Sequence, residues 1–465
     1  MAAAKPIVIV PHNPTDELYP EEEEMPHPYT SRPIGEVQPK KVVEADYDSG
    51  RAWLVLAAGF LTNVLVFGVE LNFNVFMRPL LEEFPAHDAS DVAWIGAISY
   101  GVMFLIGPLA SLLISRVGTM YAVIISGVLS CLGFLSSRFA TDVYYLYISY
   151  GLLVGSGMGI AFLSSFAILG DYFKQYIRLA SIVVAVGGGV GLFLFTKLFQ
   201  HFVEDYLGWR DAMLITAGIC LNLILLGICM RPRPRDPSVR LPTLTELMAT
   251  HVLKSSKYLL FLSHVVLWNV GLVIVFILLQ KYLSEYKFLD DDQANFVVMM
   301  LGIANTVGRV ASIPVERVAS PMKVYVIMSI LMGVFEMLLP SGWDVAGLAT
   351  ISSLLGLSFG IMICYFVAVV GELVGFENLT PALGYSNFAQ GIGGLIGPPT
   401  LAKLADGSKF IVGGAITVIS GLLVLLAIVK HWRDTVASRR TGALSVENGL
   451  YNRHSEFDRA DTAMT

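Results

Sequence analysis

The sequence predicts an all-α membrane protein with twelve transmembrane helices in two parallel six-helix repeats. Three observations lead to this fold class: the composition, twelve separate apolar blocks and an internal repeat. Of the 465 residues, 55% are hydrophobic and 15% are charged, whereas soluble domains carry about 25% charged residues. A water-soluble enzyme is therefore a poor starting hypothesis.

The apolar residues fall into twelve blocks, each close to the ~20 residues needed to cross a hydrocarbon layer of ~30 Å. The first six blocks cover approximately residues 52–77, 92–115, 119–138, 143–170, 179–200 and 211–230. The other six cover approximately 258–282, 294–315, 322–340, 343–371, 381–404 and 410–430. The number and length of the blocks predict a polytopic helical protein.

The polar segments around these blocks divide the chain into five predicted regions. The regions are a disordered cytoplasmic N-terminal tail (1–50), an N-terminal six-helix bundle (51–230), a cytoplasmic linker (231–257), a C-terminal six-helix bundle (258–432) and a cytoplasmic tail (433–465). The first tail is acidic and rich in proline, which is typical of disorder. It lacks the apolar run of a cleavable signal.

The charged residues of the loops predict which side of the membrane each loop faces, because Lys and Arg accumulate in cytoplasmic loops. The loops on one side are basic and include Arg116, Lys174, Arg178, Arg231 and Arg317. The opposite loops are acidic and include Glu82, Asp88, Asp142, Asp290 and Asp344. Both termini and the linker are therefore expected in the cytoplasm.

Several functions are not supported by the sequence. The formal net charge of −6, with no basic patch interleaved with aromatic residues, argues against nucleic acid as a partner. The four cysteines lie inside apolar blocks, without the paired spacing of a zinc site or of a disulfide framework. The eight histidines are scattered, and His264 is the only one well inside a block. We therefore expect no enzyme activity, no metal site and no cofactor.

Two sequence echoes at similar offsets indicate an internal repeat. The segment Gly107–Gly118, after the second block, matches Gly308–Ala319 after the eighth. The second echo pairs Gly187, Gly188 and Gly191 with Gly393, Gly394 and Gly397. Two halves of the same orientation form parallel repeats, the arrangement of major facilitator transporters. Chance matching between glycine-rich helices is the alternative.

The first echo also predicts a conformational gate. Gly107 and Gly118 permit close approach and turning, while Arg116 is a cation at a helix C-terminus. Arg317 stands at the equivalent position of the second half. In superfamily members this loop latches helices across the two halves on the cytoplasmic side. The alternative is that Arg116 only follows the positive-inside tendency.

Charged residues inside the blocks are candidates for substrate binding, because each is costly unless it faces a cavity or a partner. Arg309 lies in the eighth block, with Asn305 one turn earlier on the same face, and a guanidinium can bind a carboxylate bidentately. Glu70 and Asn74 belong to the polar outer half of the first block. Glu70 can pair with a basic group or take up a proton. The alternatives are snorkelling of Arg309 to the interface and a surface position for Glu70.

Two aromatic residues of the tenth block complete the candidate substrate site. Tyr365 and Phe366 are adjacent in the sequence and are candidates for lining a cavity. An aromatic residue in a transmembrane helix usually serves packing. Packing within the bundle is therefore the alternative for both.

Several short motifs form a set that resembles one family. Before the first block, Asp48-Ser-Gly-Arg-Ala-Trp53 keeps the Asp, the third-position Gly, the Ala and the Trp of a family signature. A second signature survives as Tyr172-Phe173 and Leu179-Ala180, followed by the glycine cluster. Further matches are Gly208-Trp209-Arg210, Met230-Arg231-Pro232 and Leu395-Ile-Gly-Pro-Pro399. From Asp48 to about the twelfth block, the chain resembles the monocarboxylate transporter family of the major facilitator superfamily.

The resemblance is informative about proton coupling. Proton-coupled members of the family use a Lys in helix one and an Asp four residues before an Arg in helix eight. The Arg is present as Arg309, but Asn305 stands at the Asp position and Leu71 at the Lys position. An amide cannot exchange a proton at physiological pH, so the usual relay is absent. The adjacent Glu70 points about 100° away from the position of the missing Lys.

The resemblance implies a plasma-membrane carrier that works by alternating access. We expect facilitated, proton-independent transport of a small organic acid or a carboxylate-bearing zwitterion. Three alternatives stay open: a proton-coupled symporter using Glu70, a facilitative carrier of amino acids, creatine-like or thyroid-hormone-like compounds, and a non-transporting sensor or scaffold. Besides the solute and the lipid bilayer, a single-span immunoglobulin-type companion is a candidate partner, since some family members need one.

Overall fold

The computed structural model describes residues 47–201, 208–233, 250–287, 289–342, 344–401, 404 and 407–433. Most of the predicted N-terminal tail, most of the linker and nearly all of the C-terminal tail lie outside these described residues. The described residues form α-helices, together with short 3₁₀ and π-helical segments, and none of them is in a β-strand.

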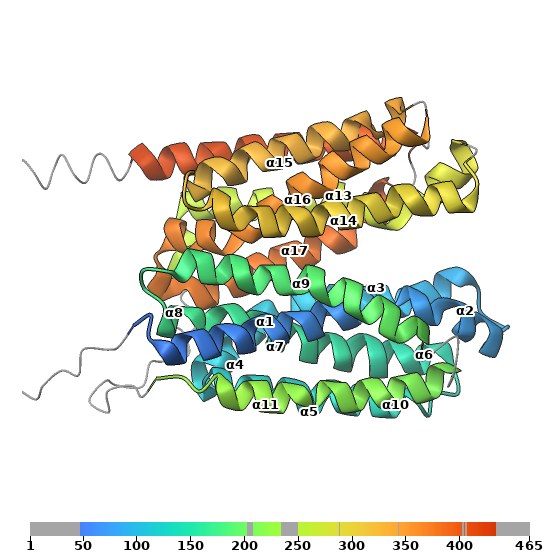
Figure 1. Ribbon diagram of the computed structural model, residues 1–465, viewed down its shortest axis with the longest axis horizontal. Helices are drawn as coiled ribbons and strands as arrows, with labels where there is room; N and C mark the ends of the chain where they lie inside the picture. Colours follow the sequence, from blue (N-terminus) through green and yellow to red (C-terminus); the bar gives the residue numbers. More distant parts are fainter. Residues whose placement is uncertain are drawn as a thin grey trace, which may run out of the picture. The chain divides into compact units, whose positions relative to one another are not determined.

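The helices of the first part of the chain form what we call the first helix group (Figure 1). They are α1 (Gly50–Glu70), α2 (Asn74–Glu83), α3 (Ala89–Leu105), α4 (Gly107–Val117), α5 (Thr119–Ser137), α6 (Val143–Leu146), η1 (Tyr147–Val154), α7 (Gly155–Ala167), α8 (Leu169–Tyr172), α9 (Ile177–Gln200), α10 (Gly208–Cys220) and α11 (Asn222–Cys229).

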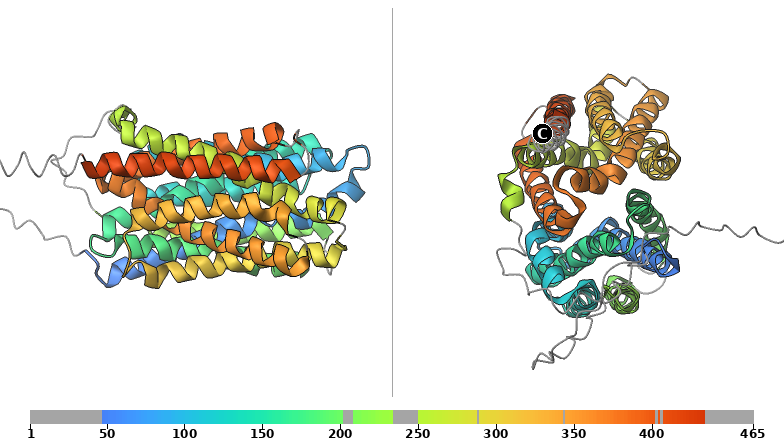
Figure 2. Two further views of the ribbon diagram at one scale, coloured as in Figure 1. Left: turned by 90° about the horizontal axis from the view of Figure 1, so that it is seen from above. Right: turned by 90° about the vertical axis from the view of Figure 1, so that its left-hand side faces the viewer.

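The remaining helices form the second helix group. They are η3 (Thr250–Lys254), α13 (Ser256–Tyr286), α14 (Asp291–Val315), α15 (Pro321–Leu338), η4 (Leu339–Ser341), α16 (Val345–Val374), η5 (Phe376–Asn378), α17 (Leu379–Leu401) and a last helix, Gly407–Arg433. Seen end-on in Figure 2, the blue and green helices gather on one side and the yellow to red helices on the other.

The two groups pack internally and also against each other. Within the first group α1 packs on α9, and α5 packs on α7 and α11. Within the second, α14 packs on α16 and α13 packs on α17. The groups meet along two seams, where α9 contacts α14 and α16, and where α17 contacts α3, α4 and α7.

The fold class of an all-α membrane protein is confirmed. Among the described residues, ten helices are long and apolar enough to cross a membrane, or eleven when the bent pair α3 and α4 counts as one span. The predicted number of twelve spans and the two-repeat layout stay predictions.

Several spans are interrupted, and the sequence gives local reasons. Helices α3 and α4 meet at an angle of 51°, immediately before Pro108, whose ring disfavours a straight continuation. Helices α1 and α2 are separated by Leu71, Asn72 and Phe73. The Asn72 amide donates to the Gly68 carbonyl oxygen at 2.7 Å, and to the Leu192 carbonyl oxygen of α9 at 3.2 Å. This side chain therefore fixes the break against α9.

The acidic loops of the sequence turn out to hold helix N-caps. The carboxylates of Asp88, Asp142, Asp290 and Asp344 each accept a hydrogen bond from a backbone N–H in the first turn of α3, α6, α14 and α16. A carboxylate at this position satisfies an unpaired N–H and interacts favourably with the helix dipole. The acidic loop residues that predicted the orientation in the membrane therefore also have a local role, because they cap helices.

The second sequence echo has the same packing role in both groups. A Cβ atom on Gly187 or Gly191 of α9 would lie 2.5 Å and 2.2 Å from carbonyl oxygens of α1. On Gly393 or Gly397 of α17, a Cβ would lie 2.3 Å and 2.7 Å from carbonyl oxygens of α13. Only glycine allows these backbones to approach so closely. The first echo differs, because Gly107 contacts the other helix group whereas Gly308 contacts α16 of its own group.

We expect Gly360→Ala to destabilise the protein, because the added Cβ would lie 2.1 Å from the Asn305 carbonyl oxygen across the contact between α14 and α16. Overpacking of this kind typically costs about 1–3 kcal/mol, and the thermal unfolding midpoint in detergent measures it. The matched control is Gly302→Ala on α14, where the new Cβ meets no atom within 4 Å and helix propensity improves. A midpoint for Gly360→Ala equal to that of the control would contradict the close packing.

Candidate functional site

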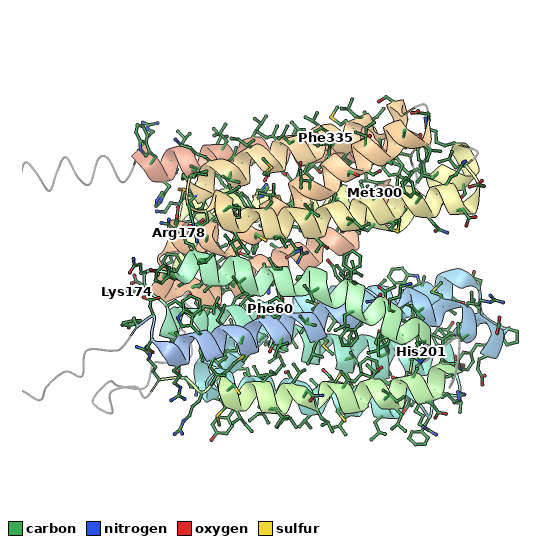
Figure 3. The ribbon with its side chains drawn as sticks, in the orientation of Figure 1. Phe60, Lys174, Arg178, His201, Met300 and Phe335 are labelled. Carbon is green, nitrogen blue, oxygen red and sulfur yellow. The ribbon has the colours of Figure 1, made fainter. Side chains whose placement is uncertain are left out.

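The two ends of the helix bundle can be named by residues. Lys174 and Arg178 lie at one end, and His201 lies toward the other (Figure 3). Helix α9 connects these two ends. We refer to them below as the Arg178 end and the His201 end.

Arg309 of α14 lies buried between the two helix groups, with 7% of its surface exposed. Its Nε–H donates to Asn305 Oδ1 at 3.1 Å, as the spacing of four residues predicts. Its Nη1–H donates to the Ala185 carbonyl oxygen of α9 at 2.7 Å. The guanidinium therefore connects the two groups and does not snorkel to an interface.

Small residues of the glycine cluster make room for this guanidinium. A Cβ on Gly188 would lie 2.7 Å from Nη1 of Arg309, and one on Gly189 would lie 3.0 Å from the Thr306 hydroxyl oxygen. The guanidinium carbon lies 5.9 Å from the centre of the Phe67 ring, within the range of a cation–π interaction. The glycines of α9 therefore serve the site as well as helix packing.

The charge of Arg309 lacks a counter-ion in the described part of the chain. Its two side-chain hydrogen bonds go to neutral oxygens of Asn305 and Ala185, and none of the described carboxylates forms an ion pair with it. A buried cation held only by neutral groups is costly unless an anion joins it. The arrangement is therefore suited to binding a carboxylate.

Glu70 lies inside the first helix group and is 5% exposed. The Ser99 hydroxyl donates to Glu70 Oε1 at 3.0 Å, whereas Oε2 has no partner among the described residues. Leu71, at the neighbouring position, is 36% exposed. The two residues thus face different surroundings, as their positions on a helix predict. The side chain of Asn74 lies outside the described residues.

Tyr100 of α3 is a site residue that the sequence did not indicate. It interacts electrostatically with both Arg309 and Glu70, and its ring lies 5.0 Å from that of Phe104. It therefore lies within electrostatic range of both candidate charges. One tyrosine in an apolar block is ordinary in sequence, so only the packing of α3 identifies it.

Tyr365 and Phe366 have different surroundings although they are adjacent. The Tyr365 hydroxyl donates to the Ser312 carbonyl oxygen of α14 at 3.0 Å, so it fastens α16 to α14. Phe366 lines a small cavity between the helix groups. The other residues that line it are Phe162, Leu163, Phe166, Val367, Leu383 and Asn387.

The predicted gate residues lie at or toward the Arg178 end. Gly107 contacts α17 of the other group, where a Cβ on Gly107 would lie 2.2 Å from the Gly384 carbonyl oxygen. Gly118 has a φ of 85°, a left-handed conformation that suits glycine. Arg116 and Arg317 are both exposed. Of these four residues, Gly107 is the one whose described contacts cross between the groups.

Ion pairs at the Arg178 end join the groups, and the sequence did not predict them. Arg178 at the start of α9 lies 3.2 Å from Glu372 and 3.7 Å from Glu316. Partial burial raises the pKa of the Glu316 carboxyl, while the guanidinium of Arg178 opposes this shift. We call these three residues the ion-pair latch.

Comparisons with known proteins agree with this architecture. Residues 56–398 match the sequence profile of the Major Facilitator Superfamily. Monocarboxylate transporter 13 of Bos taurus is 32% identical over 82% of this chain and 90% of its own length. The chain belongs to the monocarboxylate transporter family. Monocarboxylate transporter 4 of Rattus norvegicus is more distant, with 26% identity over 82% of this chain and 83% of its own length.

Solved structures of other major facilitator transporters share the fold. The human organic anion transporter MFSD10 (TETRAN) superposes with a TM-score of 0.62 at 14% identity, covering 81% of this chain and 98% of that one. The Escherichia coli fucose:proton symporter FucP gives a TM-score of 0.63 at 11% identity, with coverage of 80% and 99%. The resemblance to these two proteins shows the fold alone.

Three of the motifs that carry the resemblance to the monocarboxylate transporter family meet at the Arg178 end. The Asp48 carboxylate accepts hydrogen bonds from the backbone N–H groups of Gln175 and Tyr176, at 3.1 Å and 3.4 Å. The Trp53 ring packs edge-on against Phe173 at 5.8 Å. The Tyr172 hydroxyl donates to the Arg231 carbonyl oxygen at 2.7 Å. These contacts tie together the start of α1, the loop before α9 and the end of α11, immediately beside Arg178.

We expect Arg178→Glu to lower the thermal midpoint of this transporter, because it places three carboxylates together in the ion-pair latch. Adding Glu372→Arg should restore much of the loss, although each exposed pair contributes only about 1 kcal/mol or less. Midpoints of the single and double variants in detergent measure the coupling. The matched control is Lys323→Glu, at an exposed position of α15. Equal midpoints for the single and double variants would argue against the latch.

Proposed function

We propose that this chain is a plasma-membrane carrier that moves a small organic acid or a carboxylate-bearing zwitterion by alternating access. The observation that carries the proposal is the buried guanidinium of Arg309, which lies between the helix groups without a described counter-ion. A carboxylate can accept two hydrogen bonds from a guanidinium. The solute would therefore supply the missing negative charge.

The contacts between the groups support alternating access. The inter-group ion pairs lie at the Arg178 end, and the hydrogen bond from Arg309 to Ala185 lies deeper along α9. The basic loops and three of the family motifs meet at the same end, which we assign to the cytoplasm, with both termini. Under this assignment, the latch would hold the carrier closed toward the cytoplasm.

Transport is proposed to be facilitated and independent of protons. Asn305 occupies the position of the family's proton-carrying Asp and accepts a hydrogen bond from Arg309 Nε. An amide keeps this bond at every physiological pH, because it neither binds nor releases a proton there. The solute gradient would therefore drive net movement.

One observation favours a second candidate function, proton-coupled symport through Glu70. Its Oε2 atom is buried and has no partner among the described residues, which is the environment of a carboxyl group that can hold a proton. Tyr100 interacts electrostatically with both Glu70 and Arg309. Such a symporter would need Glu70 to exchange its proton during each transport cycle.

Arg309→Ala should abolish carboxylate uptake in transfected cells without loss of surface protein, because the cation that binds the carboxylate is gone. Arg309→Lys should retain only a small part of the uptake, since an ammonium lacks the planar fork of a guanidinium. A radiolabelled panel of lactate, pyruvate, amino acids and creatine measures this, with and without an immunoglobulin-type companion. Unchanged uptake in Arg309→Ala would refute the assignment of Arg309. Absence of flux for every solute would favour a sensor or scaffold.

Uptake should be nearly the same at an external pH of about 6 and of about 7.5, because Asn305 does not titrate in this range. Initial rates with the solute found in the panel measure the dependence. A several-fold increase at the lower pH would instead support the second candidate. Glu70→Gln then decides between them: it should remove that increase if Glu70 carries the proton.

A further inference from the structure

The small cavity beside Phe366 contains one polar group among apolar walls. Six of its seven lining residues are apolar and the seventh is Asn387 of α17. Asn387 is 2% exposed, and its Nδ2 amine has no hydrogen-bond partner among the described residues. A buried amide without a partner is unfavourable, because it has lost its water and gained nothing in return. Such a group at a cavity wall is suited to binding a ligand.

The cavity lies between the helix groups, as the candidate site does. Phe162, Leu163 and Phe166 come from α7 of the first group, and the other lining residues come from α16 and α17 of the second. One turn before Asn387, Gly384 contacts Gly107 across the same seam. A movement of the groups relative to each other would therefore change the size of the cavity directly.

Aromatic rings connect this cavity to Arg309. The guanidinium carbon of Arg309 lies 5.9 Å from the centre of the Phe67 ring. The Phe67 ring lies 5.4 Å from that of Phe162, and Phe162 lines the cavity. On α16, Cys364 contacts the Arg309 carbonyl oxygen through its sulfur, two residues before Phe366. Two aromatic rings thus lead from the cation to the cavity that the amide lines.

We propose that Asn387 is a second polar contact for the carried solute, opposite Arg309. This inference rests on the proposed function. The Arg309 guanidinium binds the carboxylate, the apolar body of the solute lies against Phe162 and Phe366, and the Asn387 amide donates to an oxygen at the far end. The solute class is then a carboxylate with an apolar, preferably ring-containing body and a remote hydrogen-bond acceptor.

The cavity must widen for the solute to reach Asn387. As it stands, it has room for about one water molecule. Separation of α7 from α17 widens it, and the glycines of the adjacent seam present no side chains that would resist such sliding. Contact with the solute then satisfies the amide in the widened state.

A pair of probes that differ only in the remote acceptor tests the proposal: 3-(4-hydroxyphenyl)propionate and 3-phenylpropionate. Uptake of each into cells expressing the full chain is compared with that of Asn387→Leu, which keeps the side-chain size and removes the donor. The matched control is Ser386→Ala at the next residue, whose hydroxyl contacts Tyr258 inside the second group. The unsubstituted chain and the control should prefer the hydroxylated probe several-fold, and Asn387→Leu should lose this preference.

A labelling experiment tests direct contact. Asn387→Cys should react with a maleimide, and the hydroxylated probe should slow this reaction several-fold, whereas Ser386→Cys should be unreactive with or without it. The unsubstituted chain supplies the background of the four native cysteines.

Two outcomes overturn the inference, and they differ from failure of the proposed function. The first is that Asn387→Leu keeps the preference for the hydroxylated probe, or that the unsubstituted chain shows no such preference. The second is labelling at Asn387→Cys that the probe does not slow. If short carboxylates are still carried and need Arg309, the proposed function stands while the role of Asn387 falls. If no carboxylate uptake depends on Arg309, the proposed function itself fails.

Discussion

The buried guanidinium of Arg309 is the constraint on which the rest of the site depends. It is held by the Asn305 side chain from its own helix and by the Ala185 carbonyl oxygen from the other helix group. Both partners are neutral, so they orient the cation without cancelling its charge. The glycines of α9 are needed next to it, since a Cβ on Gly188 would occupy its space. The contacts of this one guanidinium thus bring α14 against α9, and under the proposed function its charge selects the kind of solute.

Much of the fold follows from the sequence, because membrane spans, helix caps and glycine contacts depend on local patterns. The acidic loop residues Asp88 and Asp290 became N-caps, and the spacing of Asn305 and Arg309 gave a hydrogen bond. The register between distant helices does not follow from local patterns. Neither the pairing of Arg178 with Glu372 nor the electrostatic interaction of Tyr100 with two distant charged residues can be read from one sequence. The sequence likewise gives no sign that Asn387 lines a cavity, because that depends on how α7, α16 and α17 pack.

Buried polar groups inside one helix group have a different role from those that lie between the two groups. Glu336 accepts a hydrogen bond from the Thr417 hydroxyl at 3.1 Å, and both residues belong to the second helix group, so this carboxyl group fastens helices within that group. Glu70 likewise accepts a hydrogen bond from a hydroxyl, that of Ser99, within the first helix group. Arg309 and Asn387 instead lie where the groups meet. Leaving an amide such as that of Asn387 unpaired costs about 1–3 kcal/mol, so a state in which a solute satisfies it is favoured by a comparable amount.

None of the described carboxylates forms an ion pair with Arg309, and this has a consequence for the transport cycle. In a carrier with an Asp at position 305, a proton can adjust the charge of the site before the empty protein reorients. Asn305 cannot do this, because its amide does not ionise. The empty carrier would have to reorient with an uncompensated cation buried between its two groups, whereas a bound carboxylate neutralises that cation. Under the proposed function the loaded carrier therefore reorients more easily than the empty one, and exchange of one carboxylate for another should be faster than net movement.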